Sequence, residues 1–177
     1  MKNDSKFEIR EVDITKTLPF SDDSIDSFSA FDVIEHIPRW ERLENGVTFP
    51  FVNLMNEIFR CLKPGGIFIA VTPCYPKNEA FQDPTHVNII SKNTIYYFSS
   101  SGIPDSTRMG YGFEGNFKII HNDWLKGGGP FLSSSEFTKI TVNKKFTTLL
   151  VFLKYIKRFI KMKLRFKSSH ILWVLQK

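Results

Sequence analysis

The sequence has little cysteine and no long apolar run. Cys61 and Cys74 are its only cysteines, and their spacing makes neither a disulfide framework nor a metal motif. The opening stretch MKNDSKFEIR is polar, which argues against a signal peptide. No apolar run approaches the roughly 20 residues that span a bilayer. We therefore expect a cytoplasmic protein rather than a secreted or membrane-spanning one.

Acidic residues are absent from residues 137–177, which hold 11 lysine and arginine residues. Residues 1–136 hold the other 13 basic residues against all 18 acidic ones. Within the basic part, residues 147–167 have the period of an amphipathic helix with one basic face. This helix is expected either to cover a sheet with its apolar face or to contact an anionic membrane peripherally. We expect no specific nucleic-acid binding.

The composition is that of one globular domain. The 177 residues are 42% hydrophobic and 24% charged, and the 18 phenylalanines favour a packed interior. The pattern divides the domain into a βαβ core over residues 7–76, cap loops over 77–136, and a basic helix with a last strand over 137–177.

The clearest pattern is a βαβ unit over residues 27–72. SFSAFDVI (27–34) predicts a buried strand, and FVNLMNEIFRCL (51–62) has apolar residues at helical spacing. KPGG (63–66) ends that helix, because proline and paired glycines cannot continue it. IFIAVT (67–72) is then a continuous apolar run, as in strands that are buried on both faces.

The other elements have weaker signals. FEIREV (7–12) is a weak strand prediction, and residues 39–50 look irregular with a short helix as one alternative. The remaining predictions are a turn at Asp83–Pro84, a helix over 92–99, strands over 117–125 and 170–176, and partial alternation over 137–146.

Polar residues follow three of these strands at one edge of the predicted sheet. Asp13 follows the first strand, Glu35 and His36 follow the second, and the segment 72–75 follows the third. Ligands of open α/β sheets bind beyond the carboxyl ends of the strands. The sequence therefore predicts a site at this edge.

Two long stretches carry a resemblance to a known family. VDITKTLPFSDDSIDSFSAFDVIEHI, followed by LMNEIFRCLKPGGIFIAVTP, resembles the class I S-adenosylmethionine-dependent methyltransferases of the type 11-like group. The resemblance covers residues 7–73 in register. It implies an α/β fold with a Rossmann-like, doubly wound, mostly parallel sheet, and S-adenosylmethionine as cofactor.

The resemblance also implies cofactor contacts at two strand ends. Asp13 would accept a hydrogen bond from the adenine amino group, and the backbone of Ile14 would face the ring. Phe31 and Asp32 would lie near the methionine part, and Glu35 would line the junction with the methyl acceptor. From the residues alone, Asp13 could instead be a turn or cap acid.

Histidine supplies the candidates for the chemistry. A hydroxyl acceptor must lose a proton, and an imidazole can take it near neutral pH. His36 is the first candidate, with a site-lining role as the alternative, and Glu35 either orients it or caps the turn. His86 is the second candidate, or a loop histidine held against Asp83. No set of His, Cys and acids has metal-ligand spacing, so no metal is expected.

One element of the family is missing. Its members have a glycine-rich loop after the first strand, which lets the backbone approach the cofactor. GYGFEG (110–115) has the G-x-G-x-x-G letters, but it neither follows a strand nor opens a helix, and a loop is expected. The fold is therefore expected to lack the first two strands, as an N-terminally truncated chain.

Two functions remain open from the sequence. The first is methyl transfer to an oxygen or nitrogen of a small molecule or a cell-surface glycan precursor, since DPTHVNIIS (83–91) resembles bacterial members met in that setting. The second is a catalytically inactive remnant or partner subunit. In either case, self-association or a second chain is a candidate for completing the sheet.

Overall fold

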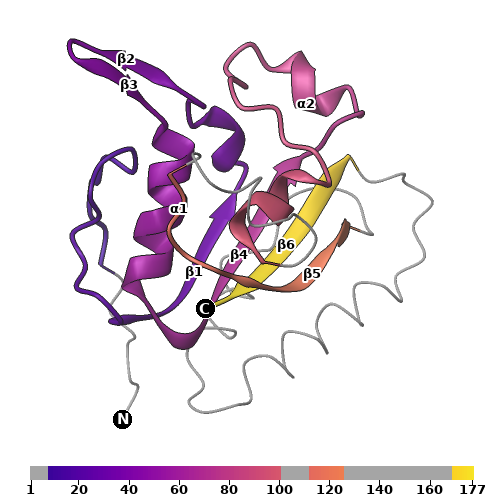
Figure 1. Ribbon diagram of the computed structural model, residues 1–177. Helices are drawn as coiled ribbons and strands as arrows, with labels where there is room; N and C mark the ends of the chain where they lie inside the picture. The colour runs from indigo at the N-terminus through magenta and orange to yellow at the C-terminus, as the bar shows by residue number, and fades with distance from the viewer. Residues whose placement is uncertain (1–7, 101–111, 126–168) are drawn as a thin grey trace.

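The computed structural model describes residues 8–100, 112–125 and 169–177. Figure 1 shows a twisted sheet with helix α1 packed along one face. Among the described residues, no helix combines the length and the apolar character needed to cross a membrane. The elements are β1 (Ile25–Phe31), a 3₁₀ turn (Ile34–His36), β2 (Glu41–Leu43), β3 (Gly46–Thr48), α1 (Pro50–Cys61), β4 (Leu62–Pro73), α2 (Glu79–Gln82), a second 3₁₀ turn (Thr94–Phe98), β5 (Lys118–Trp124) and β6 (His170–Gln176).

The main sheet has the strand order β1-β4-β6-β5. β1 and β4 are parallel and are joined through α1, which confirms the predicted βαβ unit. β6 is antiparallel to both of its neighbours, so β1, β4 and β5 point the same way. The expected α/β fold with a sheet that contains parallel strands is therefore confirmed, although two of the three pairings among the described strands of this sheet are antiparallel because β6 runs against its neighbours.

The KPGG segment lies inside β4 rather than before it. Ile25 pairs with Leu62 and Ser27 pairs with Ile67, so three extra residues of β4 bulge out between these two pairs. Gly65 has a φ of 79°, a left-handed value that glycine adopts without strain. Helix α1 thus turns directly into β4, which is five residues longer at its start than the predicted strand.

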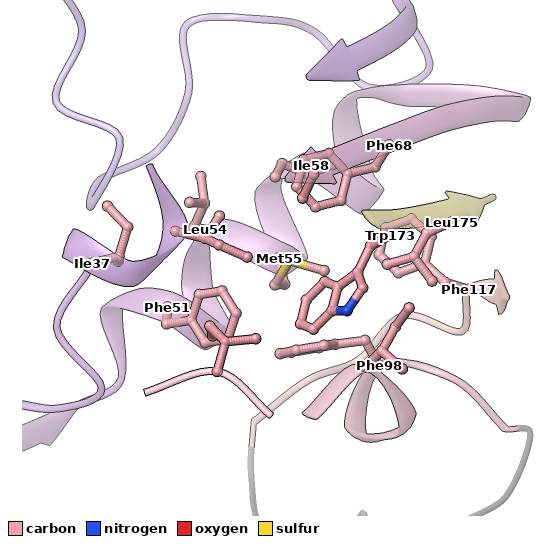
Figure 2. Close-up of a cluster of buried hydrophobic side chains, with 14 of the residues drawn as sticks. Ile37, Phe51, Leu54, Met55, Ile58, Phe68, Phe98, Phe117, Trp173 and Leu175 are labelled. Atoms are coloured by element: carbon pink, nitrogen blue, oxygen red, sulfur yellow. The ribbon is translucent and has the colours of Figure 1, made fainter. Parts of the chain in front are cut away.

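The core fills the space between α1 and the sheet. Figure 2 shows Trp173 of β6 among side chains from α1, β4 and the 3₁₀ turn Thr94–Phe98. Trp173, Met55 and Cys61 are fully buried. The opposite face of the sheet has a second apolar cluster, which includes Ile69 and Val174.

Two predicted elements were wrong. Residues 8–12 form no strand: residues 8–10 are exposed, and among the described residues β1 pairs with β4 alone. Residues 39–50 contain the β2–β3 hairpin and no short helix. Its two-residue turn is Glu44–Asn45, between the paired residues Leu43 and Gly46.

Other predictions differ only in extent. The helix predicted over 92–99 is the shorter 3₁₀ turn Thr94–Phe98, and residues 112–115 are a loop as expected. The predictions for residues 137–146 and for the basic helix 147–167 lie outside the described residues.

Candidate functional site

The candidate site lies where the parallel strands β1 and β4 end. After β1, Asp32 adopts a left-handed backbone conformation with a φ of 51°. The Asp32 N–H donates to the Val71 carbonyl at 2.9 Å, which ties this turn to β4. The chain then enters the 3₁₀ turn Ile34–His36, which places Glu35 and His36 at this edge of the sheet. Such an edge is where open α/β sheets bind ligands.

Asn88 holds a second loop against this turn. Its Nδ2 donates to the Ile34 carbonyl at 3.0 Å, and its backbone N–H donates to the Glu35 carbonyl at 2.9 Å. Arg39 Nε donates to Asn88 Oδ1 at 2.7 Å. Because Asn88 is 1% exposed, these bonds are shielded from water and fix His86 beside the turn.

Glu35 is a buried carboxylate with one bonded and one unbonded oxygen. The residue is 1% exposed, and the Thr72 hydroxyl donates to Oε2 at 2.8 Å. Oε1 has no hydrogen-bond partner among the described residues. Burial raises the pKa of the Glu35 carboxyl above its usual range, against the lowering effect of hydrogen bonds from its own backbone N–H and from Thr72. An unpaired buried oxygen marks a place where a ligand, ion or proton is expected.

The structure brings His36 and His86 together with Glu35. The two imidazole rings meet edge to face, with centroids 4.8 Å apart and planes at 71°. One ligand atom from each of the three side chains lies within 4.8 Å of the others. The side chain of His86 is 8% exposed, and its Nε2 lies 3.9 Å from Asp83 Oδ2. The two candidate catalytic histidines therefore share one small space with the carboxylate.

Thr85 fixes the proton of His36. Its hydroxyl and its backbone N–H both donate to Asp83 Oδ1, at 2.6 and 2.8 Å, and these bonds hold the pKa of Asp83 below its usual value. His36 Nδ1 lies 3.0 Å from Thr85 Oγ1 and 3.2 Å from the Thr85 carbonyl. Since the hydroxyl proton is used by Asp83, we assign the proton of His36 to Nδ1, which leaves the Nε2 lone pair available.

Ile14 lines an apolar groove beside the end of β1. The groove has a volume of about 180 Å³. Val33 and Ile34, the two residues before Glu35, also line it. Its other lining residues come from the loop before β1, from β1 itself and from the core: Val12, Leu18, Phe20, Phe28, Ser29, Ala30, Leu54, Ile58 and Phe68.

Asp13 lies outside the groove lining, in an exposed turn. Its Oδ1 accepts hydrogen bonds from the Thr15 hydroxyl at 2.6 Å and the Thr15 N–H at 2.9 Å. These two bonds lower the pKa of Asp13. The turn role that the residues alone allowed is therefore present, and Oδ2 is left for another donor.

Phe31 lies apart from the Glu35 cluster, whereas the carboxylate of Asp32 lies close enough to add to the effect of burial and raise the pKa of Glu35. Phe31 packs against the apolar cluster on the opposite face of the sheet. Asp32 Oδ1 lies 3.2 Å from His170 Nε2 in a geometry that makes no hydrogen bond. His121 lies in β5, where burial lowers its pKa. Neither His121 nor His170 joins the group formed by the other two histidines.

Sequence reasoning missed Thr85 and Asn88. Both belong to the stretch DPTHVN, where an Asp two residues before a Thr is the signal for a turn closed by the Asp side chain. That signal predicts the local turn around Asp83. It does not predict that the turn packs against Glu35, since this depends on contacts between segments about 50 residues apart along the chain.

The comparisons with known proteins agree with the geometry of the sheet. Residues 1–70 match a family described as a methyltransferase domain. No curated protein matches the chain. Among solved structures, an S-adenosylmethionine-dependent methyltransferase from Archaeoglobus fulgidus is similar in fold, with a TM-score of 0.51 at 13% identity, over 99% of this chain and 70% of that protein.

Two further solved structures are more distant. The [4+2]-cyclase SpnF has a TM-score of 0.47 at 14% identity over 94% of this chain. The protein bound to the Trm112 methyltransferase activator of Haloferax volcanii has a TM-score of 0.45 at 16% identity over 93% of this chain. This chain spans 54% and 59% of their lengths.

Proposed function

We propose that this chain, whose residues 1–70 match a methyltransferase domain, transfers a methyl group from S-adenosylmethionine to an oxygen or nitrogen atom of a small molecule or a cell-surface glycan precursor. The observation that carries the proposal is the convergence of Glu35, His36 and His86 at the carboxyl ends of β1 and β4. Ligand sites of this kind of sheet lie at that edge.

The groove fits one end of the cofactor. Small-molecule sites usually exceed about 300 Å³, so a groove of about 180 Å³ suits a part of adenine size. In this proposal Ile14 contacts the adenine ring, and Asp13 Oδ2 accepts from its amino group. Asp32 and the backbone of Phe31 would contact the methionine part. S-adenosylmethionine supplies a methyl group on a positively charged sulfur.

The Glu35 cluster would receive the acceptor. The transfer needs the nucleophilic atom held close and in line with the methyl group. His36 Nε2 faces away from its Thr85 partner and is available to the acceptor proton. His86 and Glu35 border the same space, so these residues would position the acceptor and help to remove its proton.

The acceptor class is supported by two features near this cluster. Residues 83–91 resemble bacterial methyltransferases met in a glycan setting. Figure 1 shows the β2–β3 hairpin and the α2 segment projecting beyond the same end of the sheet. Three exposed aromatic side chains in or next to these segments would contact an acceptor: Trp40, Tyr75 and Phe81, which are 62%, 54% and 54% exposed.

A second polypeptide chain, either a copy of this one or another subunit, would complete the sheet at β1. Among the described residues, β1 pairs with β4 on one side and with no strand on the other. β1 is mostly half-buried, whereas residues 67–73 of β4 are fully buried. A chain that needs such a partner could also act as a non-catalytic subunit, and the binding experiment below separates these roles.

Calorimetric titration of S-adenosylmethionine into the purified chain tests the proposal. We expect micromolar binding, and at least about tenfold weaker binding for Asp13→Asn. Asparagine can keep the turn to Thr15 but has no second oxygen for the adenine amino group. Glu11→Gln, an exposed neighbour, is the matched control and should bind as the unaltered chain does.

The transfer itself is tested with radiolabelled cofactor and a panel of hydroxyl and amine acceptors. Labelled product from a glycan precursor or small molecule is the expected result. Cofactor binding without product from any acceptor would support the non-catalytic subunit. A folded chain that binds no cofactor, alone or associated, would contradict both the proposed activity and the proposed cofactor contacts.

A further inference from the structure

Two buried acceptor atoms lie unpaired in one small space at the site. Glu35 Oε1 and His86 Nδ1 are both buried, and neither has a hydrogen-bond partner within the part of the chain that the structure describes. Glu35 is 1% exposed, so water does not reach its carboxylate from outside. Lone pairs buried together in this way are satisfied by a cation, by a shared proton or by a bound water molecule.

The other polar atom of each side chain already has a neighbour. Glu35 Oε2 accepts from the Thr72 hydroxyl at 2.8 Å. His36 Nδ1 lies 3.2 Å from the Thr85 carbonyl, and His86 Nε2 lies 3.9 Å from Asp83 Oδ2. Metal-bound histidines usually donate from the second ring nitrogen to a carbonyl or carboxylate. His36 has such a carbonyl neighbour, whereas the separation at His86 is an ion-pair distance and too long for a hydrogen bond. Each side chain is therefore oriented with one free ligand atom.

We propose that Glu35, His36 and His86 bind a divalent transition-metal ion through Oε1, Nε2 and Nδ1. The three side chains offer ligand atoms within 4.8 Å of one another. Ligands about 2.1 Å from a tetrahedral zinc ion lie roughly 3.4 Å apart. Small side-chain rotations that move the ligand atoms by about one ångström would bring them to this spacing.

The ligand set selects the class of metal. Two neutral imidazoles and one carboxylate suit Zn²⁺, Co²⁺, Mn²⁺ or Fe²⁺, and they leave coordination positions open. Ca²⁺ and Mg²⁺ prefer sets of oxygen ligands, which these residues do not provide. The carboxylates of Asp32 and Asp83 lie nearby and add negative charge, which favours a cation.

The role of the metal in catalysis rests on the proposed function, whereas metal binding itself does not. In the proposed function, His36 and His86 help to remove the proton of the acceptor. With both histidines bound to a metal, an acceptor hydroxyl at an open position would instead lose its proton to solvent, because the metal lowers the pKa of that hydroxyl. The bound oxygen would then be placed beside Glu35, ready to accept the methyl group.

Cobalt titration of the tag-free, chelator-treated chain tests the site directly. Co²⁺ with nitrogen and oxygen ligands gives visible absorption, so we expect saturable one-to-one binding that Zn²⁺ displaces. Glu35→Gln and His86→Asn should each weaken binding at least about tenfold. His121→Asn, a histidine of β5 outside the cluster, is the matched control and should leave binding unchanged. Circular dichroism confirms that each variant is folded.

The cobalt titration of the unaltered chain tests the site even if a variant fails to fold. No saturable absorption with folded protein, or binding that Glu35→Gln and His86→Asn do not weaken, would overturn the metal site and leave the space to a water molecule or a shared proton. Methyl transfer that persists in chelator would overturn the metal's role while the proposed function stands. Metal binding without cofactor binding would support the site and contradict the proposed function.

Discussion

Glu57 and Arg60 fasten the loop before β1 to helix α1. Glu57 Oε2 accepts from the Leu18 N–H at 2.8 Å and from Arg60 Nη2 at 2.6 Å. Arg60 also donates to the carbonyls of Leu18 and Phe20, at 3.2 and 2.9 Å. The hydrogen bond from Arg60, followed by the one from Leu18, holds the pKa of Glu57 below its usual value. This loop forms one wall of the groove.

Replacing Glu57 with glutamine should lower the free energy of unfolding by about 1–3 kcal/mol at pH 7, because hydrogen bonds to a charged group are lost. The folded-state pKa of Glu57 is lowered, so its contribution is full above the unfolded pKa of about 4.3 and is lost as pH falls through the lower folded value. Urea denaturation at pH 7 and below pH 4 measures the difference. The exposed Glu44→Gln is the control. If the difference in the free energy of unfolding between the unaltered chain and Glu57→Gln does not shrink in acid, this account is contradicted.

The two cysteines should be unreactive in the folded chain. Cys61 and Cys74 are both 0% exposed. Desolvation raises the pKa of the Cys74 thiol to about 11, so little thiolate is present near neutral pH. We expect neither cysteine to react with an aromatic disulfide reagent at pH 8 until urea is added. Fast reaction of either thiol in the folded chain would show that its burial is incomplete.

At the scale of elements, the KPGG segment controls the passage from α1 to β4. It allows the helix to turn into the strand within the bulge opposite β1. A Cβ atom on Gly66 would lie 2.8 Å from the Lys63 carbonyl oxygen and 3.2 Å from that of Asp26. Backbone atoms on both sides therefore leave no room for a side chain there.

The substitution Gly66→Ala should destabilise the chain by about 1–3 kcal/mol, the usual cost of overpacking. The same urea denaturation measures it. Ser21→Ala, in the exposed loop before β1, should change stability by less than about 0.5 kcal/mol. An equal effect of the two substitutions would mean that the backbone around Gly66 adjusts freely.

At the scale of the whole molecule, the edge of β1 that pairs with no described strand is the feature with the largest consequence. The Asp32 N–H points to β4, and in a parallel pair the N–H groups of every second residue point to the same side. The N–H groups of Ser27 and Ser29 therefore point away from β4. An unpaired edge of this kind is a template for another strand.

We expect the purified chain to associate through this edge at micromolar concentrations, as measured by sedimentation equilibrium. Ser29→Pro removes an outward N–H, which edge strands tolerate, and should shift the chain toward monomer with its circular dichroism unchanged. Ala30→Pro removes an N–H that points to β4 and should unfold the chain. Unchanged association of Ser29→Pro would contradict pairing at β1.

The sequence predicted the elements whose signal is local and strong. α1 follows from its apolar period, and β4 and β6 from continuous apolar runs. The strand prediction for residues 8–12 was wrong because a weakly alternating segment forms a strand only when a partner strand is present. The meeting of His86 with Glu35 could not be predicted, since it depends on the bonds that Asn88 makes across the fold.

The central position of β6 has a consequence for synthesis. β4 and β5 are held together by a strand whose residues leave the ribosome about 100 residues after β4, or roughly 5 to 20 seconds later at ordinary rates of translation. Until then, β4 has β1 on one side and an unoccupied, strongly apolar edge on the other. The nascent chain therefore passes through a stage at which chaperones can bind it, and mutations that slow the docking of residues 170–176 should lower the yield of protein more than they lower its final stability.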